Sequence, residues 1–173
     1  VGFNPVAIAI NPLTNRIYVV DESSSNVTVI KDDNPVATVD VGNSPRTIAI
    51  NPQTNKIYVA SNNGNDENDN LSVIDGNDNS ITTIVIGKKP SSIAVNPQTN
   101  KIYVANENSN NVTVIDSDNN MITTLDVGSA PTAIAINLQT NQIYVANQGS
   151  DNVTVIDANN NSTIVDVIGE PIA

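Results

Sequence analysis

The stretch NPQTNKIYVA at residues 51–60 occurs four times with few changes, and these copies decide the fold. The others are NPLTNRIYVV at 11–20, NPQTNKIYVA at 96–105 and NLQTNQIYVA at 137–146. Their tyrosines are spaced by 40, 45 and 41 residues: Tyr18, Tyr58, Tyr103 and Tyr144. Self-similarity at a nearly fixed period of this length is the signature of a repeat architecture. Four repeats therefore account for nearly all of the 173 residues.

Each repeat contains four short runs of β-branched and aromatic residues, separated by turn residues. In the third repeat these runs are 91–95, 101–105, 111–116 and 122–127. Runs of 5 to 6 residues, rich in Val, Ile, Thr and Tyr and bounded by Asn, Asp, Pro and Gly, are typical of strands. The connection Asn-Pro-Gln-Thr-Asn suits a tight antiparallel hairpin, with its last Asn at positive φ. We expect no helix.

Polarity differs between the strands of one repeat. The first two runs are almost entirely apolar, whereas the last two alternate apolar residues with Thr or Asp. A four-stranded sheet that is buried at one edge and repeated about every 41 residues matches a β-propeller blade. We therefore predict an all-β propeller of four tandem antiparallel blades, forming a single domain or segment over 1–173, with blades at about 1–41, 42–86, 87–127 and 128–173.

The repeated phrase P-x-x-I-A-I-N-P-x-T-N-x-I-Y-V-A-N, followed by N-V-T-V-I-D and a closing V-G, resembles the YVTN-type β-propeller repeat of surface-layer and other secreted proteins. The resemblance covers the whole chain and implies an extracellular or cell-surface protein. Propellers of this type typically close with seven blades, whereas four are present here. Three arrangements stay open: a segment of a longer propeller, two arcs that pair into an eight-bladed ring, or a chain that closes or polymerises in another way.

Composition excludes several classes of partner and of chemistry. A net charge of −11 with seven Lys and Arg residues gives no basic surface for nucleic acid or anionic lipid. Apolar runs are shorter than the roughly 20 residues of a membrane helix, so we expect no membrane insertion. The chain contains no His and no Cys, and it lacks a G-x-S-x-G elbow and a phosphate-binding loop. Catalytic triads, thiol nucleophiles and imidazole metal sites are therefore excluded.

These exclusions lead to a functional prediction. Propeller enzymes that use carboxylates and a central metal are the enzyme class left open, and the sequence disfavours it. We predict a non-catalytic structural or assembly module of the cell surface, not an enzyme, whose partners are further copies of itself, edge to edge, or other envelope proteins. The alternative is a recognition or adhesion module that binds protein or carbohydrate through the variable loops between the second and third strands.

Asn-X-Ser/Thr sequons are the most regular chemical signal in the chain. They begin at six predicted N-glycosylation sites: Asn26, Asn70, Asn111, Asn152, Asn160 and Asn161. The first four open the third strand of each repeat, where an exposed amide would carry a glycan without disturbing the core. The alternative is purely structural, because Asn ends the preceding turn and Thr is the outward residue of an alternating strand.

Carboxylates are the remaining candidates for a site. The loop 61–70 is four or five residues longer than its counterparts and carries three of them: Asp66, Glu67 and Asp69. Such oxygen-rich loops can bind calcium, the one cofactor that the sequence leaves open, and a solvated insertion is the alternative. The aspartates after the third strands, Asp75, Asp116 and Asp157, recur with the repeat, which favours turn capping over catalysis. The tyrosines are interpreted as blade-packing residues.

Overall fold

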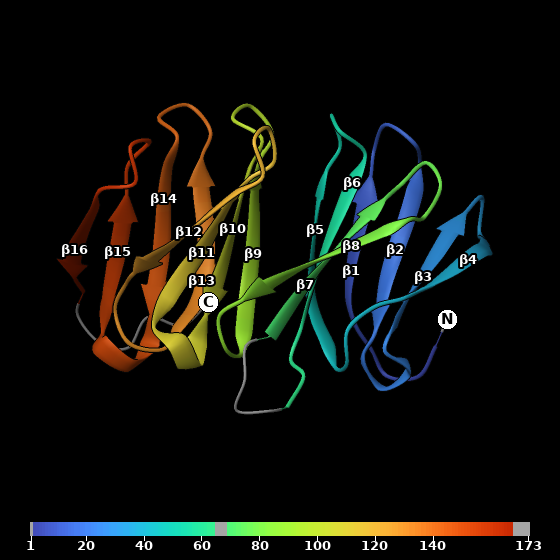
Figure 1. Ribbon diagram of the computed structural model, residues 1–173, viewed down its shortest axis with the longest axis horizontal. Coiled ribbons are helices and arrows are strands. Elements are labelled where there is room, and N and C mark those ends of the chain that lie inside the picture. The colour runs from blue at the N-terminus through green and yellow to red at the C-terminus, as the bar shows by residue number, and fades with distance from the viewer. Residues whose placement is uncertain (1, 65–68, 168–173) are drawn as a thin grey trace. The chain divides into compact units, whose positions relative to one another are not determined.

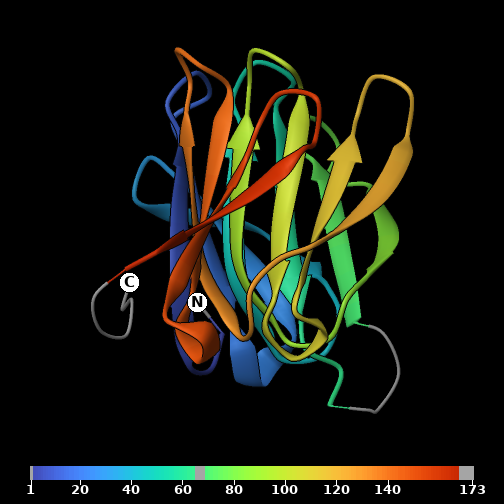
Figure 2. The same ribbon diagram turned by 90° about the vertical axis from the view of Figure 1, so that its left-hand side faces the viewer.

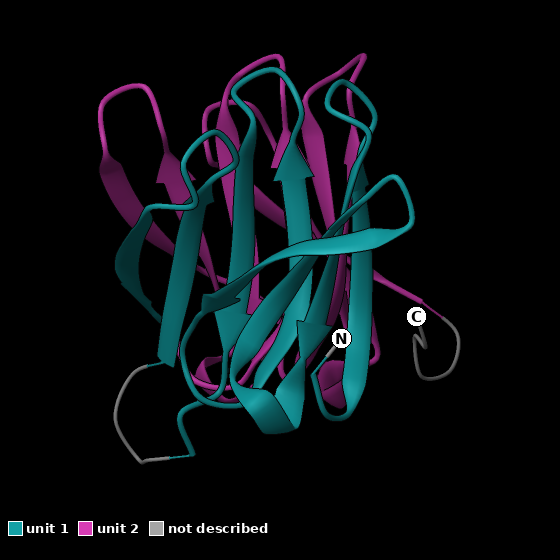
Figure 3. Ribbon diagram, turned by 90° about the vertical axis from the view of Figure 1, so that its right-hand side faces the viewer, with its two compact units in different colours: residues 1–86 teal, residues 87–173 magenta. Residues whose placement is uncertain are grey.

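The computed structural model describes residues 2–64 and 69–167. The chain divides into two compact units, residues 1–86 and 87–173, which Figure 3 colours separately. The division falls at the predicted boundary between the second and third blades. Each unit holds two four-stranded antiparallel sheets, and we describe each unit by itself.

The strands of every sheet are neighbours in chain order (Figure 1). In unit 1, blade 1 comprises β1 (Pro5–Asn11), β2 (Arg16–Asp21), β3 (Asn26–Lys31) and β4 (Asn34–Asp40), and blade 2 comprises β5 (Pro45–Asn51), β6 (Lys56–Ser61), β7 (Asp69–Asp75) and β8 (Ile81–Ile86). In unit 2, blade 3 comprises β9 (Pro90–Asn96), β10 (Lys101–Asn106), β11 (Asn111–Asp116) and β12 (Met121–Asp126), and blade 4 comprises β13 (Pro131–Asn137), β14 (Gln142–Asn147), β15 (Asn152–Ile156) and β16 (Ser162–Asp166). The prediction of an all-β fold built from four-stranded propeller blades is confirmed.

Helical structure in the described ranges is limited to three short 3₁₀ turns between second and third strands. These turns are η1 (Glu22–Ser24), η2 (Glu107–Ser109) and η3 (Gln148–Ser150). Across the residues that the structure describes, no helix has the length and apolar character needed to cross a membrane.

The hairpin between the first and second strands has the predicted turn chemistry. In blade 3, Asn96 Oδ1 accepts the backbone N–H of Gln98 at 3.0 Å, and Asn100 has a φ of 48°. Asparagine tolerates this left-handed conformation, which closes the turn. The side chain of Asn96 also reaches the next blade, because its Nδ2 donates to Asn141 Oδ1 at 2.8 Å. Asn11 of blade 1 donates to Asn55 of blade 2 in the same way, at 2.7 Å.

Alternation along the strands gives each blade two apolar faces. We call Tyr face the side that carries the repeated tyrosine, and Ile face the opposite side, which carries the isoleucine before that tyrosine. In unit 1 the Tyr face of blade 1 packs on the Ile face of blade 2, through Tyr18, Val20, Val27, Val29 and Val39 against Ile48, Ile50, Ile57, Val59 and Ile74. In unit 2 the Tyr face of blade 3 packs on the Ile face of blade 4, through Tyr103, Val112 and Val114 against Ile134, Ile136, Ile143, Val145 and Ile156. The interpretation of Tyr18 and Tyr103 as blade-packing residues is confirmed.

Candidate functional site

A buried polar cluster closes the end of the second strand in each blade. In blade 3, Asn106 Nδ2 donates to Asn111 Oδ1 at 2.8 Å and to Thr113 Oγ1 at 2.9 Å. In blade 1, Asp21 replaces the asparagine, and the Thr28 hydroxyl donates to its carboxylate at 2.6 Å. The interpretation of these threonines as outward residues is wrong: Thr28 and Thr113 are buried, because their hydroxyls pair with the polar residue on the neighbouring strand.

The same cluster explains the recurring glycine of the V-G connections. A Cβ atom on Gly87 would lie 2.7 Å from Asn106 Cβ, and one on Gly42 would lie 2.8 Å from Ser61 Cβ. Real Cβ atoms do not approach other heavy atoms this closely, so a larger residue would displace the cluster or the connection. The glycine is therefore a close-packing residue at these positions, and its recurrence in the sequence marks the polar cluster.

Among the predicted glycosylation sites, the asparagines differ in exposure. Asn161 is exposed; Asn26, Asn70, Asn111 and Asn160 are half-buried; and Asn152 is 8% exposed. The Oδ1 atoms of Asn111 and Asn152 accept hydrogen bonds from Asn106 and Asn147. Asn161 is therefore the most exposed residue of the set, although its amide donates to Asp157, and glycosylation at these positions stays a prediction.

The predicted calcium loop is described only in part. Asp66 and Glu67 lie outside the described residues. Asp69 begins β7 and is buried, and its Oδ1 accepts the backbone N–H of Asn63 at 2.7 Å, so this carboxylate holds its own loop together. In the described ranges, no three carboxylates gather to form a metal site. Calcium binding by Asp66, Glu67 and Asp69 stays a prediction.

The recurring aspartates cap the outer hairpins, as expected. Oδ1 of Asp75, Asp116 and Asp157 accepts the backbone N–H two residues further on, at 2.9, 3.0 and 2.8 Å. At Asp157 the side-chain amide of Asn161 also donates to the carboxylate, at 2.9 Å. At Asp157 these hydrogen bonds favour the charged form of the carboxylate over the neutral form.

One consequence is a measurable shift in the titration of Asp157. Its side-chain and backbone hydrogen bonds from Asn161 lower the pKa of the carboxyl below 3.8. The pKa of Asp157 is therefore lower in the folded chain than in the unfolded chain. The hydrogen bonds to its carboxylate stabilise the folded chain fully above pH 3.8, and this stabilisation is lost as the pH falls through the folded pKa. We expect Asn161→Ala to raise the pKa of Asp157 toward 3.8 in an NMR titration of the side-chain carboxyl resonances. An unchanged pKa in this variant would contradict the assigned cause.

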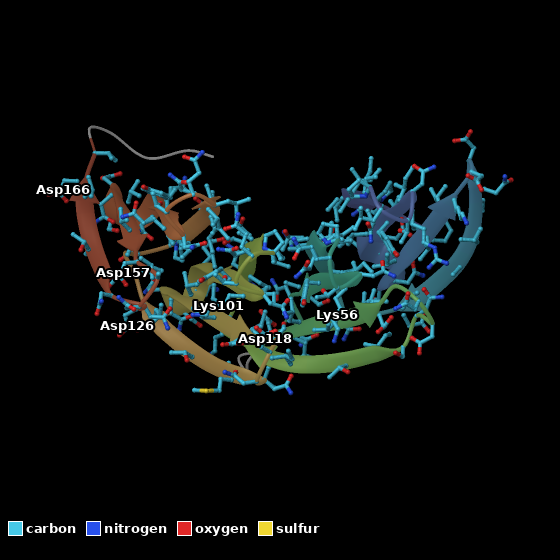
Figure 4. All side chains as sticks on the ribbon, turned by 90° about the horizontal axis from the view of Figure 1, so that it is seen from above. Lys56, Lys101, Asp118, Asp126, Asp157 and Asp166 are labelled. Carbon is cyan, nitrogen blue, oxygen red and sulfur yellow. The ribbon has the colours of Figure 1, made fainter. Side chains whose placement is uncertain are left out.

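A cavity of about 190 Å³ lies between blades 3 and 4 of unit 2. Its walls combine charged, polar and apolar side chains: Lys101, Val114, Asp116, Met121, Thr123 and Asn160. Lys101 and Asp116 are register partners on β10 and β11, so an ammonium and a carboxylate reach the cavity from neighbouring strands. Asn160 Oδ1 is buried, and no described residue donates a hydrogen bond to it. Figure 4 labels Lys101, together with Asp118 of the same blade and Asp157 of blade 4.

In blade 1 of unit 1, the repeat position of Lys101 is occupied by an arginine, Arg16. Arg16 begins β2 as Lys101 begins β10, and its guanidinium Nη1 donates to the carbonyl oxygen of Gly76 in blade 2. The longer arginine thus bridges its two blades, whereas the ammonium of Lys101 has no ion pair or hydrogen bond to the described residues. Sequence reasoning missed this cavity. At this repeat position the four blades carry Arg16, Lys56, Lys101 and Gln142, so the residue type alone does not mark blade 3 as the place of the cavity.

Tyr103 is the register partner of Val114, one of the residues that line the cavity. Burial, and secondarily the negative charge of Asp116, raises the pKa of its hydroxyl above 10.0, so the phenol is neutral at physiological pH. The region therefore combines a free cation, a carboxylate and a buried amide oxygen at a cavity large enough for a small molecule. A carboxylate can take a proton from water, and an ammonium can stabilise a developing oxyanion.

Comparison with known proteins gives one matching sequence family. Its description is Lactonase, 7-bladed beta-propeller, and it matches residues 2–123 and 87–173 in two overlapping segments. No curated protein matches the chain.

Solved structures with the same blade arrangement include three whose names indicate enzymes. Hydrazine synthase from Kuenenia stuttgartiensis has a TM-score of 0.80 at 21% identity, covering 96% of this chain and 51% of that chain. Virginiamycin B lyase from Staphylococcus aureus has a TM-score of 0.78 at 14% identity, covering 94% and 55%. A putative 6-phosphogluconolactonase from Bacteroides uniformis has a TM-score of 0.74 at 14% identity, covering 96% and 55%. At these identities the likeness shows the fold alone, and the chain spans about half the length of each structure.

The family match overturns the prediction of a non-catalytic structural module and of a chain that is not an enzyme. Both predictions are wrong, because the description of the matching family, Lactonase, is the name of an enzyme. The prediction failed because it took the absence of His and Cys as evidence against any catalysed reaction. Without these residues triads and thiol nucleophiles are excluded, but attack by water on an ester needs only a base and an electrostatic partner, which Asp and Lys supply.

Proposed function

The chain belongs to the Lactonase, 7-bladed beta-propeller family, and on that premise we propose that its blades contribute to a propeller enzyme that opens a cyclic ester by hydrolysis. The family match, which spans residues 2–123 and 87–173, is the observation that carries the proposal. The cavity between blades 3 and 4 supports the proposal, because a carboxylate, an ammonium and an amide line it together. Activity, substrate and the extracellular location implied by the YVTN-type resemblance are all proposals for this chain.

Two side chains of the cavity have roles in the proposed reaction. The Asp116 carboxylate takes a proton from a water molecule as the water oxygen bonds to the carbonyl carbon of the ester. The carbonyl electrons move to its oxygen, where the Lys101 ammonium stabilises the negative charge. Collapse of this intermediate re-forms the carbonyl and breaks the ring C–O bond, and the leaving oxygen takes the proton back from Asp116. The product is a hydroxy acid, and Asp116 is regenerated.

The charge of the protein suits this reaction. A lactone is neutral and approaches a chain of net charge −11 without repulsion, whereas the product is an anion. The summed negative field of the protein therefore favours departure of the product over its retention. Lys101 concentrates positive charge at the cavity and polarises the carbonyl group locally.

Hydrolysis of a panel of five- and six-membered lactones, followed by proton release with a pH indicator, tests the proposal. We expect turnover by the native chain, a roughly 10²- to 10⁴-fold loss for Asp116→Asn, and a roughly 10²- to 10³-fold loss for Lys101→Ala. Asparagine at position 116 keeps the side-chain oxygen that caps the turn. A lower rate in Asp116→Asn therefore measures the loss of the carboxylate that accepts the proton.

Lys56→Ala and Asp75→Asn are the matched controls, because these residues are register partners in blade 2 as Lys101 and Asp116 are in blade 3. We expect both controls to stay within about twofold of the native rate, which is the usual behaviour of side chains outside the reacting geometry. Equal losses in both blades, or native rates in Asp116→Asn, would remove the cavity from the reaction. A native chain without turnover on any lactone would remove the proposed reaction itself.

A further inference from the structure

The connection between β6 and β7 contains the one Asn-Gly dipeptide of the sequence, Asn63 followed by Gly64. Asparagine is chemically labile, because the backbone nitrogen of the next residue can attack its side-chain amide carbon. Glycine in that next position makes the attack easiest, since it has no Cβ atom to crowd the ring that forms. In Figure 2 the segment 62–64 extends beyond the ends of β6 and β7, at the lower right of the view. Whether the dipeptide reacts depends on how firmly the fold holds these two residues.

The structure leaves this dipeptide free to react. Gly64 is exposed and has a φ of 69°, and no atom lies within 4 Å of the position that a Cβ would take. Its backbone N–H donates only to Asn62 Oδ1, at 3.0 Å, in an exposed contact two positions away. The backbone N–H of Asn63 donates to Asp69 Oδ1 at 2.7 Å, but its side-chain amide has no hydrogen bond to the described residues. Approach of the Gly64 nitrogen to the amide carbon therefore requires that a single exposed hydrogen bond opens.

A comparable dipeptide in the outer hairpin of the same blade is held firmly. Asp75 and Gly76 could form the same ring, but the buried Gly76 donates its backbone N–H to the carbonyl oxygen of Asn55 at 2.8 Å. Asp75 Oδ1 accepts both the backbone N–H and the side-chain amide of Asn77, each at 2.9 Å. A Cβ on Gly76 would lie 2.5 Å from Asn55 Oδ1, so the turn is also closely packed. Ring closure at this position requires the hairpin to open.

We propose that Asn63 is a modification site, at which the folded chain reacts with water to give aspartyl and isoaspartyl residues and releases ammonia. The Gly64 nitrogen loses its proton and bonds to Asn63 Cγ. The bond from Cγ to the amide nitrogen breaks, and this nitrogen leaves as ammonia with the proton. The product is a five-membered imide.

Water then opens the imide in one of two ways. When the bond from the Gly64 nitrogen to Cγ breaks, position 63 becomes aspartyl; when the bond to the backbone carbonyl carbon breaks, it becomes isoaspartyl. In both cases the nitrogen regains a proton from the water and the chain gains a negative charge. The isoaspartyl form also adds an atom to the backbone between positions 63 and 64, within the variable loop of blade 2.

Peptide mapping by mass spectrometry, after incubation at neutral pH for increasing times, tests the proposal. Fragmentation that distinguishes aspartyl from isoaspartyl residues locates the product, and digestion in ¹⁸O-labelled water marks any conversion that occurs during digestion. We expect both products at position 63 of the folded chain. Their rate of formation should lie within about tenfold of the rate in the urea-unfolded chain, because the net strength of one exposed hydrogen bond corresponds to no larger a factor.

Asp75→Asn is the matched control, because it places the same dipeptide in the firmly held hairpin. We expect position 75 of this variant to react at least about 100-fold more slowly in the folded chain than in urea, since several hydrogen bonds must open together. Position 63 of the same molecules should react as in the native chain. The comparison within one chain separates the effect of local structure from the chemistry of the dipeptide.

Two further variants test the assigned atoms. Asn63→Gln should give no product at position 63 on the same timescale, because a glutamine must close a larger ring. Asn62→Ala removes the one hydrogen bond of the Gly64 nitrogen and should raise the rate roughly twofold to tenfold. Circular dichroism of both variants should show an unchanged fold. A folded native chain without product at position 63 when the unfolded chain has converted, or equal rates at positions 63 and 75 of folded Asp75→Asn, would overturn the proposal.

Discussion

Tyr18→Ala is expected to lower the free energy of unfolding by about 3–5 kcal/mol, the range for removing a large aromatic side chain from a packed core. Tyr18 is fully buried between blades 1 and 2, among Val27, Val29 and Ile57. Loss of the ring leaves a cavity that strands held by hydrogen bonds on both sides cannot collapse to fill. Urea unfolding, followed by circular dichroism, measures the change as a lower midpoint at an unchanged slope.

Two further variants separate the causes of this loss. Tyr144→Ala removes the same residue from the same repeat position, where it is 37% exposed, and should cost less than about 1.5 kcal/mol in dilute, monomeric protein. Tyr18→Phe keeps the ring and removes a buried hydroxyl that has no hydrogen-bond partner among the described residues, so its cost should be near zero. Equal losses in Tyr18→Ala and Tyr144→Ala would contradict the assigned role of blade packing.

Asn147→Ala is expected to cost about 2–4 kcal/mol of unfolding free energy, through lost hydrogen bonds inside blade 4. Asn147 is fully buried, and its amide donates to Asn152 Oδ1 at 2.9 Å and to Thr154 Oγ1 at 2.8 Å. Alanine removes both donors and leaves the buried acceptors with fewer partners. The backbone N–H of Gly128 also donates to Thr154 Oγ1, at 3.2 Å. The substitution should therefore also weaken the V-G connection at Gly128.

The matched control for this cluster is Asn147→Asp. Blade 1 carries Asp21 at the same position, where the Thr28 hydroxyl donates to the carboxylate, and Thr154 can donate to an aspartate at 147 in the same way. We therefore expect Asn147→Asp to lower the free energy of unfolding, at neutral pH, by less than half as much as Asn147→Ala does. Hydrogen exchange of the Gly128 amide provides a local readout, because its protection should fall in Asn147→Ala and be largely retained in Asn147→Asp. A loss in Asn147→Asp as large as in Asn147→Ala would contradict the assigned hydrogen bonds.

Much of the architecture was predictable because it is written in local patterns that recur. Strands β9 to β12 end within one residue of the runs predicted for the third repeat. The turns at Asn96 to Asn100 follow from the backbone preferences of asparagine and proline, which act over a few residues. The capping role of Asp116 was likewise predictable, because its partner is the backbone N–H of a residue two positions away. The prediction of a non-catalytic module failed because it rested on residue types that are absent, and absent types exclude mechanisms without excluding a reaction.

The sequence by itself determined the repeat, its four strands and the division into blades, since β-branched alternation and turn residues act locally and need no distant partner. Only the tertiary structure showed that Thr113 points inward to Asn106, that Lys101 lines a cavity where Arg16 forms a bridge, and that Tyr103 and Tyr144 differ in burial. These three facts depend on which strand or blade lies alongside. Copies of one repeat acquire different surroundings according to the neighbours that cover them, and a sequence of nearly identical copies does not record those neighbours.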